Sequence, residues 1–192
     1  SGFSAWRGIG SSDSKNINIY LGSDSHVVCY PINDMLQTSF TGIYKTSNSA
    51  EESWRREGSH SELSQDLKNY DAFLHSLFYS SNKVFRWGLY KRDKLETFKI
   101  KDITLLGDAA HPMLPFLAQG ASMALEDAFI FGTLAKHFTN DYEKIQNYYE
   151  KLRLKRVHSI QSASEKQAFY NHVSNPILLK VRNYLLKNTN IA

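Results

Sequence analysis

The chain has 192 residues, of which 42% are hydrophobic and 13% aromatic, a composition typical of a globular protein and not of a disordered one. No run approaches the ~20 apolar residues of a membrane-spanning helix, so a membrane span is not expected. The formal net charge is only +4, and the single cysteine, Cys29, excludes an internal disulfide; a reducing compartment, the cytoplasm, is expected.

The first third of the chain is predicted to be β-structure. Short runs rich in β-branched and aromatic residues are separated by turn residues, and they lie at 1–9, 16–21, 25–31 and 34–44. Because parallel strands need long crossover connections, these short connections predict antiparallel hairpins.

A helix and a further strand are predicted next. Apolar residues at helical spacing run from Leu63 to Leu77, and they predict one helix over 61–81 with Ser61 as its N-cap. The segment KVFRWGLYK, at 83–91, is expected to return to strand.

The last part of the chain combines one buried strand with helices. The run ITLL at 103–106 is continuous and apolar, as in a strand that is buried on both faces. Helices are predicted at 120–138 and from about 141 to 173, and a helical tail starts at Pro176.

The basic residues concentrate in the C-terminal helices. From Asp141 onward there are nine Lys and Arg against four Asp and Glu, and the densest stretch is KLRLKR at 151–156. One interpretation is a patch for nucleic acid or an anionic membrane surface. A solvated helix face is favoured, because no aromatic residues interleave with the charges as in a nucleic-acid-binding motif.

The stretch after ITLL carries the chemistry. Gly107 allows a tight turn or the close approach of a ligand, and Asp108 places an acceptor-only carboxylate at the carboxyl end of the predicted strand. Pro112 and Pro115 stiffen the segment that follows. A carboxylate in this position is suited to binding the hydroxyls of a sugar or polyol.

A helix start follows the two prolines. The residues Gln119, Gly120, Ala121 and Ser122 open the helix with small side chains, so its first N–H groups, which have no partner within the helix, stay open to a ligand. Such a terminus attracts negative charge. On spacing alone, the pattern fits a ligand grip and a plain strand–loop–helix connection equally well.

The sequence of this stretch resembles a known family. GDAAHPMLP followed by AQGASMALEDA closely resembles the second flavin-binding motif of the single-component FAD-dependent aromatic hydroxylases, which include salicylate and hydroxybenzoate hydroxylases. The segments ESWRREGS, RWGLYKRDKLETF and YEKLRLKRVHSIQ follow the family's order. The resemblance therefore spans most of the chain, and residues 103–128 are its most specific part.

The resemblance implies a set of cofactor contacts. Asp108 would bind the ribityl hydroxyls of FAD, Pro115 would lie beside the isoalloxazine ring, and the amides around Gly120 would face the N1–C2=O edge of the ring. That edge becomes anionic when the flavin is reduced, so a helix start stabilises it. The implied cofactor-binding set is Gly107, Asp108, Pro115, Gln119, Gly120, Ala121 and Ser122.

The resemblance also implies an activity and a substrate site. The family reduces FAD with NAD(P)H and uses O2 to hydroxylate a small aromatic, usually phenolic, substrate, and its antiparallel sheet forms a wall of the substrate pocket. His26, Tyr30 and Trp87 are candidates for substrate contact, although a strand Tyr is more often a core residue and Trp87, like Arg86, is more often structural. His111 in its HPMLP turn is expected to pack or hydrogen-bond rather than to act as a base.

Other residue patterns give no site. Asp127, inside an apolar helix, is expected to be a buried acid that accepts hydrogen bonds. The seven histidines show no metal-ligand spacing, so no metal is expected. No nucleic-acid partner is expected either.

The sequence departs from the family's pattern at two positions in the motif. Ala118 stands where a glycine is usual, and its methyl group would restrict the loop if a positive φ is needed there. Ser122 stands where an Asn is common.

Two family motifs are missing from the sequence. The GxGxxG turn that binds the ADP part of FAD is absent, since the single GxG at 8–10 lacks the third glycine, and none of the ten glycines follows an Asp to give the DG motif. The chain is therefore expected to be the C-terminal portion of a hydroxylase: an expressed fragment, a split gene product or a degraded paralogue.

The prediction for the whole chain is an α+β fold without the N-terminal dinucleotide-binding βαβ unit. Residues 1–100 would form the substrate-binding antiparallel sheet with one helix, and residues 101–192 would carry the GD motif and the C-terminal helices. Two functional hypotheses remain: part of an FAD-dependent aromatic monooxygenase whose N-terminal FAD-binding half is supplied elsewhere, or a non-catalytic remnant or interaction module that does not bind FAD alone.

Overall fold

The computed structural model divides the chain into two compact units, Ser1–Tyr90 with Phe169–Ala192, and Lys91–Ala168. The structure describes residues 1–33, 36–47, 53 and 55–188. The expected mixture of helices and an antiparallel sheet is confirmed.

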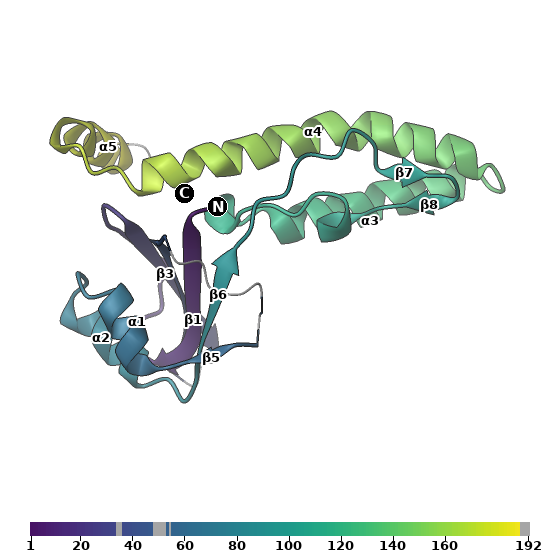
Figure 1. Cartoon of the computed structure of the whole chain (residues 1–192). Coiled ribbons are helices and arrows are strands. Elements are labelled where there is room, and N and C mark those ends of the chain that lie inside the picture. The colour runs from purple at the N-terminus through teal and green to yellow at the C-terminus, as the bar shows by residue number, and fades with distance from the viewer. Residues whose placement is uncertain (34–35, 48–52, 54, 189–192) are drawn as a thin grey trace. The chain divides into compact units, whose positions relative to one another are not determined.

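The first unit is built on a six-stranded antiparallel sheet (Figure 1), in the order β2-β3-β4-β1-β6-β5. Its strands are β1 (Phe3–Ser11), β2 (Asn18–Leu21), β3 (Ser25–Asn33), β4 (Gln37–Lys45), β5 (Glu57–Gly58) and β6 (Val84–Leu89). The hairpins β2–β3 and β3–β4 are confirmed, and the start of the fourth predicted run, 34–35, lies outside the described residues. The hairpin expected between the first two runs is wrong, because β1 pairs with β4 and β6 in the middle of the sheet.

One face of this sheet packs against two short helices. Side chains alternate along a strand, so Trp6, Phe40 and Val84 point to the same side and meet helices α1 (His60–Asp66) and α2 (Ala72–Tyr79). The helices supply the other half of the core, and its buried members include Leu63, Leu67, Leu74, Leu77 and Phe78. Figure 1 shows both helices on one side of the sheet.

The single helix expected over 61–81 is wrong in two respects. The N-cap is Ser59, whose hydroxyl accepts a hydrogen bond from Glu62 N while the Glu62 carboxylate accepts one from Ser59 N, a capping box. The helix ends at Asp66 with Leu67 as its C-cap, and Asp71 then caps a second helix by accepting a hydrogen bond from Leu74 N at 3.0 Å. The apolar spacing continues across the break because both helices bury their apolar residues in the same core cluster.

The C-terminal residues return to the first unit. Helix α4 (Tyr142–Asn171) is followed by α5 (Pro176–Asn188), as predicted. His172, between them, lies against β3: its Nε2 is 2.8 Å from Nδ1 of His26, and Phe3 stacks on its ring. Both histidines are buried.

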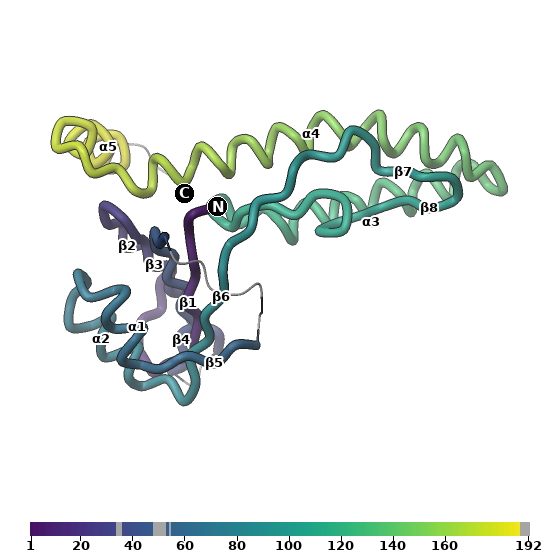
Figure 2. Tube along the Cα trace, viewed as in Figure 1, coloured from purple at the N-terminus to yellow at the C-terminus, as the bar shows by residue number. Residues whose placement is uncertain are grey.

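The second unit pairs two helices with a short β-ribbon. Helix α3 (Gly120–His137) runs alongside α4, and strands β7 (Lys99–Ile100) and β8 (Ile103–Thr104) pair antiparallel at one end (Figure 2). The buried strand expected at 103–106 is wrong: only Ile103 and Thr104 are in a strand, and Ile103 is 63% exposed.

Among the helices in the described part of the chain, none is long and apolar enough to cross a membrane.

A substitution in β1 tests the packing of α2 on the sheet. A Cβ on Gly10 would lie 2.2 Å from the Leu77 carbonyl oxygen, so Gly10→Ala should lower the free energy of unfolding of the first unit by about 1–3 kcal/mol. Ile9→Ala is the matched control, because the adjacent Ile9 side chain is half exposed; its effect should be clearly smaller. All three tryptophans lie in the first ninety residues, so urea unfolding followed by tryptophan fluorescence measures this unit. Equal effects of the two substitutions would contradict the packing.

The buried histidine pair predicts a pH dependence of stability. Burial lowers the pKa of both rings to about 4; the neighbouring His172 adds to this for His26, and Lys45 adds to it for His172. Since the unfolded rings titrate near 6.5, the unfolded chain takes up protons first as the pH falls. The free energy of unfolding should therefore be constant above about pH 6.5 and should fall by roughly 2 kcal/mol or more between pH 6.5 and 4.

The variant His172→Gln should reduce that fall, measured as urea unfolding at a series of pH values. The control His137→Gln removes an exposed histidine and should leave the fall unchanged. A pH profile of His172→Gln identical to that of the wild type would rule out the pair as its source.

Candidate functional site

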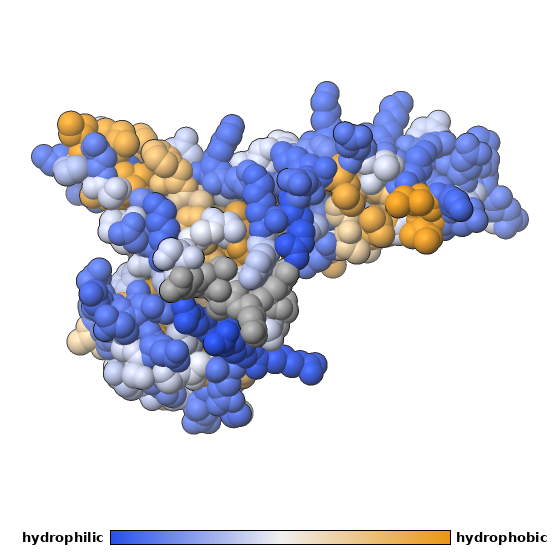
Figure 3. Space-filling view, viewed as in Figure 1, coloured by the Kyte–Doolittle hydropathy of each residue, from blue (hydrophilic) through white to orange (hydrophobic). Residues whose placement is uncertain are grey.

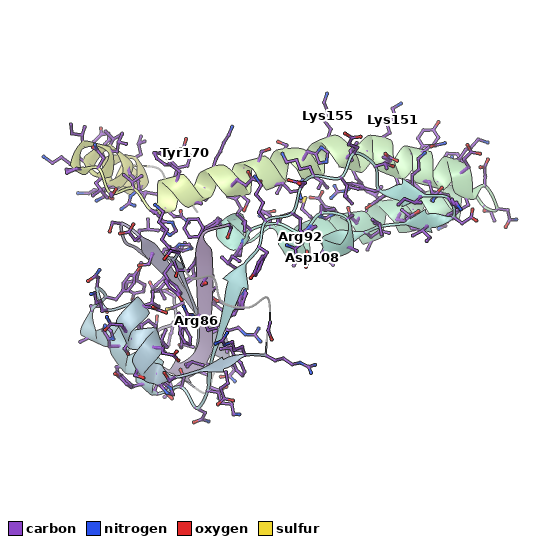
Figure 4. All side chains as sticks on the ribbon, in the orientation of Figure 1. Arg86, Arg92, Asp108, Lys151, Lys155 and Tyr170 are labelled. Atoms are coloured by element: carbon purple, nitrogen blue, oxygen red, sulfur yellow. The ribbon has the colours of Figure 1, made fainter. Side chains whose placement is uncertain are left out.

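The centre of the candidate site is the turn that follows β8. Leu106 is extended, and Gly107 then takes a positive φ of 57°, which opens the 3₁₀ turn η1 (Gly107–Ala109). A Cβ on Gly107 would lie 3.3 Å from the Cβ of Ala124 in α3, so the turn packs closely against that helix. The side chain of Asp108 is exposed. A carboxylate is thus held out to solvent beside the first turns of α3 (Figure 4).

The start of α3 leaves its amides accessible. Within the described part of the chain, Gln119 at the N-cap makes no side-chain hydrogen bond to the helix. The first intrahelical bond runs from Met123 N to Gln119 O, 2.9 Å. Ala121 and Ser122 are exposed and Gly120 is half-buried. The turn that carries Asp108 packs against the same helix one turn after these amides, where Gly107 lies against Ala124.

The segment with Pro112 and Pro115 links the turn that carries Asp108 to the start of α3. Pro115 is exposed and begins a second 3₁₀ turn, η2 (Pro115–Leu117), and Ala118 ends it in the left-handed region with φ 52°. The positive φ considered for position 118 is therefore present, and an alanine there is strained relative to a glycine. Helix α4 supports this segment, because Gln161 Nε2 donates to the Pro112 carbonyl at 3.1 Å and Ser164 Oγ donates to that of Leu114.

A buried carboxylate holds the turn through hydrogen bonds. Asp127 in α3 is fully buried and accepts hydrogen bonds from Gly107 N at 2.8 Å, from His111 Nε2 at 2.6 Å and from Arg153 Nε at 2.6 Å. The expectation that Asp127 is a buried, hydrogen-bonded acid is confirmed. Burial raises the pKa of this carboxyl, but the three hydrogen bonds outweigh burial and lower it to about 2.

The cation of this cluster comes from the basic stretch of α4. Arg153 is 0% exposed, and besides Asp127 it binds Glu126 and donates to the Met123 carbonyl. Arg156, further along α4, binds Glu126 from the solvent side. The interpretation of 151–156 as a solvated face is therefore wrong for Arg153. It holds for Lys151 and Lys155, which are exposed and project from the side of α4 away from α3 (Figure 4).

Two more buried polar groups adjoin the carboxylate. Tyr149 OH and His111 Nδ1 have no hydrogen-bond partner among the residues that the structure describes, and both rings pack against Phe98. Burial raises the pKa of the Tyr149 hydroxyl, and the nearby Asp127 charge raises it further. His111 is hydrogen-bonded and packed, as expected, and its buried ring is held by Asp127.

The predicted substrate contacts share one face of the sheet, opposite α1 and α2. His26 pairs with Ile43, Ile43 with Ala5, and Ala5 with Trp87, so these four side chains form one row across the strands, because directly paired residues point to the same face. Tyr30, four residues along β3, points to the same face and is 43% exposed. Arg86 points to the other face, where its Nε donates to Tyr44 OH at 2.7 Å.

The same face also carries a basic residue that the sequence analysis did not single out. Arg7 is exposed on the same face, and its guanidinium carbon is 5.6 Å from the ring centroids of both Phe85 and Trp87. A hollow of 510 Å³ adjoins it, lined by Arg7, Gly8, Ile9, Gln37, Ser39, Asn82, Lys83 and Phe85. The available signal was an arginine at an alternating position between Ala5 and Ile9 in an otherwise apolar strand. The chemistry is that of an anion site with an aromatic wall.

No group of three or more His, Cys, Asp or Glu side chains is arranged to hold a metal ion in the part of the chain that the structure describes.

Comparison with known proteins identifies a family and relatives that are similar in sequence. The family model described as FAD binding domain matches residues 6–164. A 3-amino-4-hydroxybenzoate 2-monooxygenase of Streptomyces platensis is 30% identical over 154 residues, which cover 80% of this chain and 39% of the relative. A 3-hydroxybenzoate 6-hydroxylase of Aquipseudomonas alcaligenes is 30% identical over 170 residues, covering 88% and 52%. The chain therefore spans about half, or less, of the length of these relatives.

Solved structures share the fold. A salicylate hydroxylase in complex with substrate aligns with a TM-score of 0.79 at 22% identity, over 97% of this chain and 52% of that chain. HpxO from Klebsiella pneumoniae, complexed with FAD and uric acid, aligns with a TM-score of 0.82 at 20% identity, over 98% and 49%. The family match confirms the resemblance seen in the sequence and the family's cofactor, FAD. The chain belongs to the FAD-binding domain family, alongside the hydroxybenzoate monooxygenases.

Proposed function

We propose that this chain provides the substrate-binding sheet and the ring-end flavin contacts of an FAD-dependent monooxygenase, which hydroxylates a small aromatic substrate with NAD(P)H and O2. The observation that carries the proposal is the exposed Asp108 carboxylate beside the uncapped start of α3. NAD(P)H as the reductant, a phenolic substrate and a cytoplasmic location are parts of the same proposal.

The residues of the turn fit the flavin. The Asp108 carboxylate accepts hydrogen bonds from ribityl hydroxyls, and the N–H groups of Gly120, Ala121 and Ser122 donate to the electron-rich edge of the ring. Exposed Pro115 and neighbouring Gln119 complete the set around the ring. FAD supplies the redox chemistry when bound, while these groups orient it and place the positive end of the helix dipole where negative charge develops.

The hollow beside Arg7, on the sheet face opposite α1 and α2, fits an anionic aromatic substrate. It has the size of a small-molecule site, and Arg7 beside Phe85 offers a cation next to an aromatic surface. An aromatic carboxylate or phenolate matches that combination. His26, Tyr30 and Trp87 stay predicted substrate contacts on this face. The ring of the buried His26 is also bonded to His172.

An N-terminal FAD-binding half is also part of the proposal. The relatives are about twice as long as this chain, and the GxGxxG turn for the ADP part of FAD is missing from the sequence. Apolar side chains gather on the surface of the second unit around α3 and the β7–β8 ribbon (Figure 3), including exposed Leu125, Phe129, Ile100 and Ile103. A further layer packed on these residues would bury them.

The alternative is a remnant or interaction module that does not bind FAD. The observation in its favour is Ala118 at a positive φ, because the strain of an L-residue there costs about 1 kcal/mol or more. Flavin binding separates the two hypotheses.

The first test of the proposal is flavin binding and its dependence on Asp108. The purified chain alone should retain no flavin, because most contacts of the ADP part would lie in the other half. Expressed with a βαβ unit encoded upstream in its gene, it should be yellow, and Asp108→Ala should weaken FAD binding by roughly tenfold or more, since charge-assisted hydrogen bonds to the hydroxyls are lost. Fluorescence quenching of added FAD measures the affinity.

Asp102→Ala, which removes an exposed carboxylate from the turn between β7 and β8, is the control and should bind FAD like the wild type. Tight, stoichiometric flavin in the chain alone would refute the division of contacts. An unchanged affinity in Asp108→Ala would refute the assigned role.

A second test concerns Arg7. If its guanidinium binds the acidic group of the substrate, 3-hydroxybenzoate should bind the chain more tightly than phenol, and Arg7→Met should remove most of the difference, roughly a factor of ten. Changes in the NMR signals of the β1 and β6 amides during titration give both affinities. Lys15→Met is the control for net charge, because Lys15 is exposed and outside the hollow. Equal binding of the two ligands to the wild type would exclude an anion site.

A further inference from the structure

We infer that Asp127 and Arg153 are positioning residues of the flavin site, through which α4 sets the conformation of the turn that presents Asp108. The inference rests on the proposed function. Neither residue is exposed, so neither is assigned a contact with flavin or substrate. Their role is exerted through Gly107 and His111.

The turn is held at both of its ends by the same carboxylate. Gly107 N and His111 Nε2 each donate to Oδ2 of Asp127, and Asp108 lies between these two residues. Gly107 has a positive φ. In a flexible loop, a glycine would also populate many other backbone conformations. The two bonds, together with the bonds from Ala110 N and His111 N to Gly107 O, select one of these conformations.

Arg153 holds the carboxylate in turn. Its Nε donates to Oδ1 of Asp127, and the rest of the guanidinium is used by Glu126 and by the Met123 carbonyl. The arginine therefore has a fixed position on α4, and it leaves Oδ2 of Asp127 to the turn. Without Arg153, the buried Asp127 carboxylate would lose its guanidinium partner, and such a charge takes up a proton or draws in water. Either change weakens the acceptor for Gly107 N.

A second arginine provides a matched comparison. Arg156 binds the same Glu126, also from α4, but it is exposed, and its ion pair and hydrogen bonds within the described residues are with Glu126 and not with Asp127 or the turn. A general role of the α3–α4 ion pairs in stability predicts effects for both arginines. A positioning role predicts an effect on the turn for Arg153 only.

The experiment compares Arg153→Met, Arg156→Met and the wild-type chain by amide hydrogen exchange. In Arg153→Met, exchange at Gly107 should accelerate by roughly tenfold or more relative to Ile130 in the middle of α3, because the bond to Asp127 is lost while the helix remains. In Arg156→Met, the ratio of the two rates should stay within about twofold of the wild type. Asp127→Asn serves as a second variant that keeps the side-chain shape, and it should accelerate Gly107 exchange in the same way.

Parallel acceleration of Gly107 and Ile130 in Arg153→Met would show a merely structural role and overturn the inference. The same holds if Arg156→Met has an equal effect on Gly107.

A titration with FAD then separates this inference from the proposed function, with each variant expressed together with the upstream βαβ unit and freed of flavin. NMR signals of the Asp108 and Ser122 amides should move in the wild type, and the apparent affinity should fall by roughly tenfold in Arg153→Met but not in Arg156→Met. A wild-type chain whose signals do not respond contradicts the proposed function. A wild-type response that Arg153→Met leaves unchanged contradicts the positioning role alone.

Discussion

The hydrogen bonds of one buried carboxylate determine the geometry of the candidate site. Asp127 joins three segments that are distant in the sequence: the turn after β8, helix α3 and helix α4. A charge buried in this way is stable only when a cation and further donors surround it, and Arg153, His111 and Gly107 meet that requirement. The exposed Asp108 owes its position to this arrangement, so the accessible carboxylate depends on the inaccessible one.

The two faces of the sheet in the first unit have different roles: one packs against α1 and α2, and the other carries the predicted substrate contacts. Alternate residues of β1 and β6 send Trp6 and Arg86 to the face covered by α1 and α2, and Arg7 and the buried Trp87 to the opposite face. The same alternation brings the buried His26 and the exposed Tyr30 to that opposite face from β3. A basic residue therefore lies among aromatic rings on the face opposite α1 and α2, and the substrate proposal rests on this separation.

Much of the fold followed from local patterns. Strand alternation, turn residues and helical spacing predicted the strands of the sheet except the short β5, and the helices α3, α4 and α5, because the physical signal for each lies within a short segment. The error in strand pairing arose because the partners are distant in sequence. β1 lies in the middle of the sheet because it pairs with β6, far along the chain, and the ITLL run ends its strand after Thr104 although its composition is that of a buried strand.

The sequence by itself determined the family, the GD turn and the helix start with small side chains, since all of these are properties of consecutive residues. Only the tertiary structure decided that Arg153 is buried against Asp127, that His26 meets His172, and that Arg7 lies between Phe85 and Trp87. A charged side chain looks the same in sequence whether it is solvated or paired in the interior. Its role is set by which element packs against it, and that information lies in contacts between residues far apart in the chain.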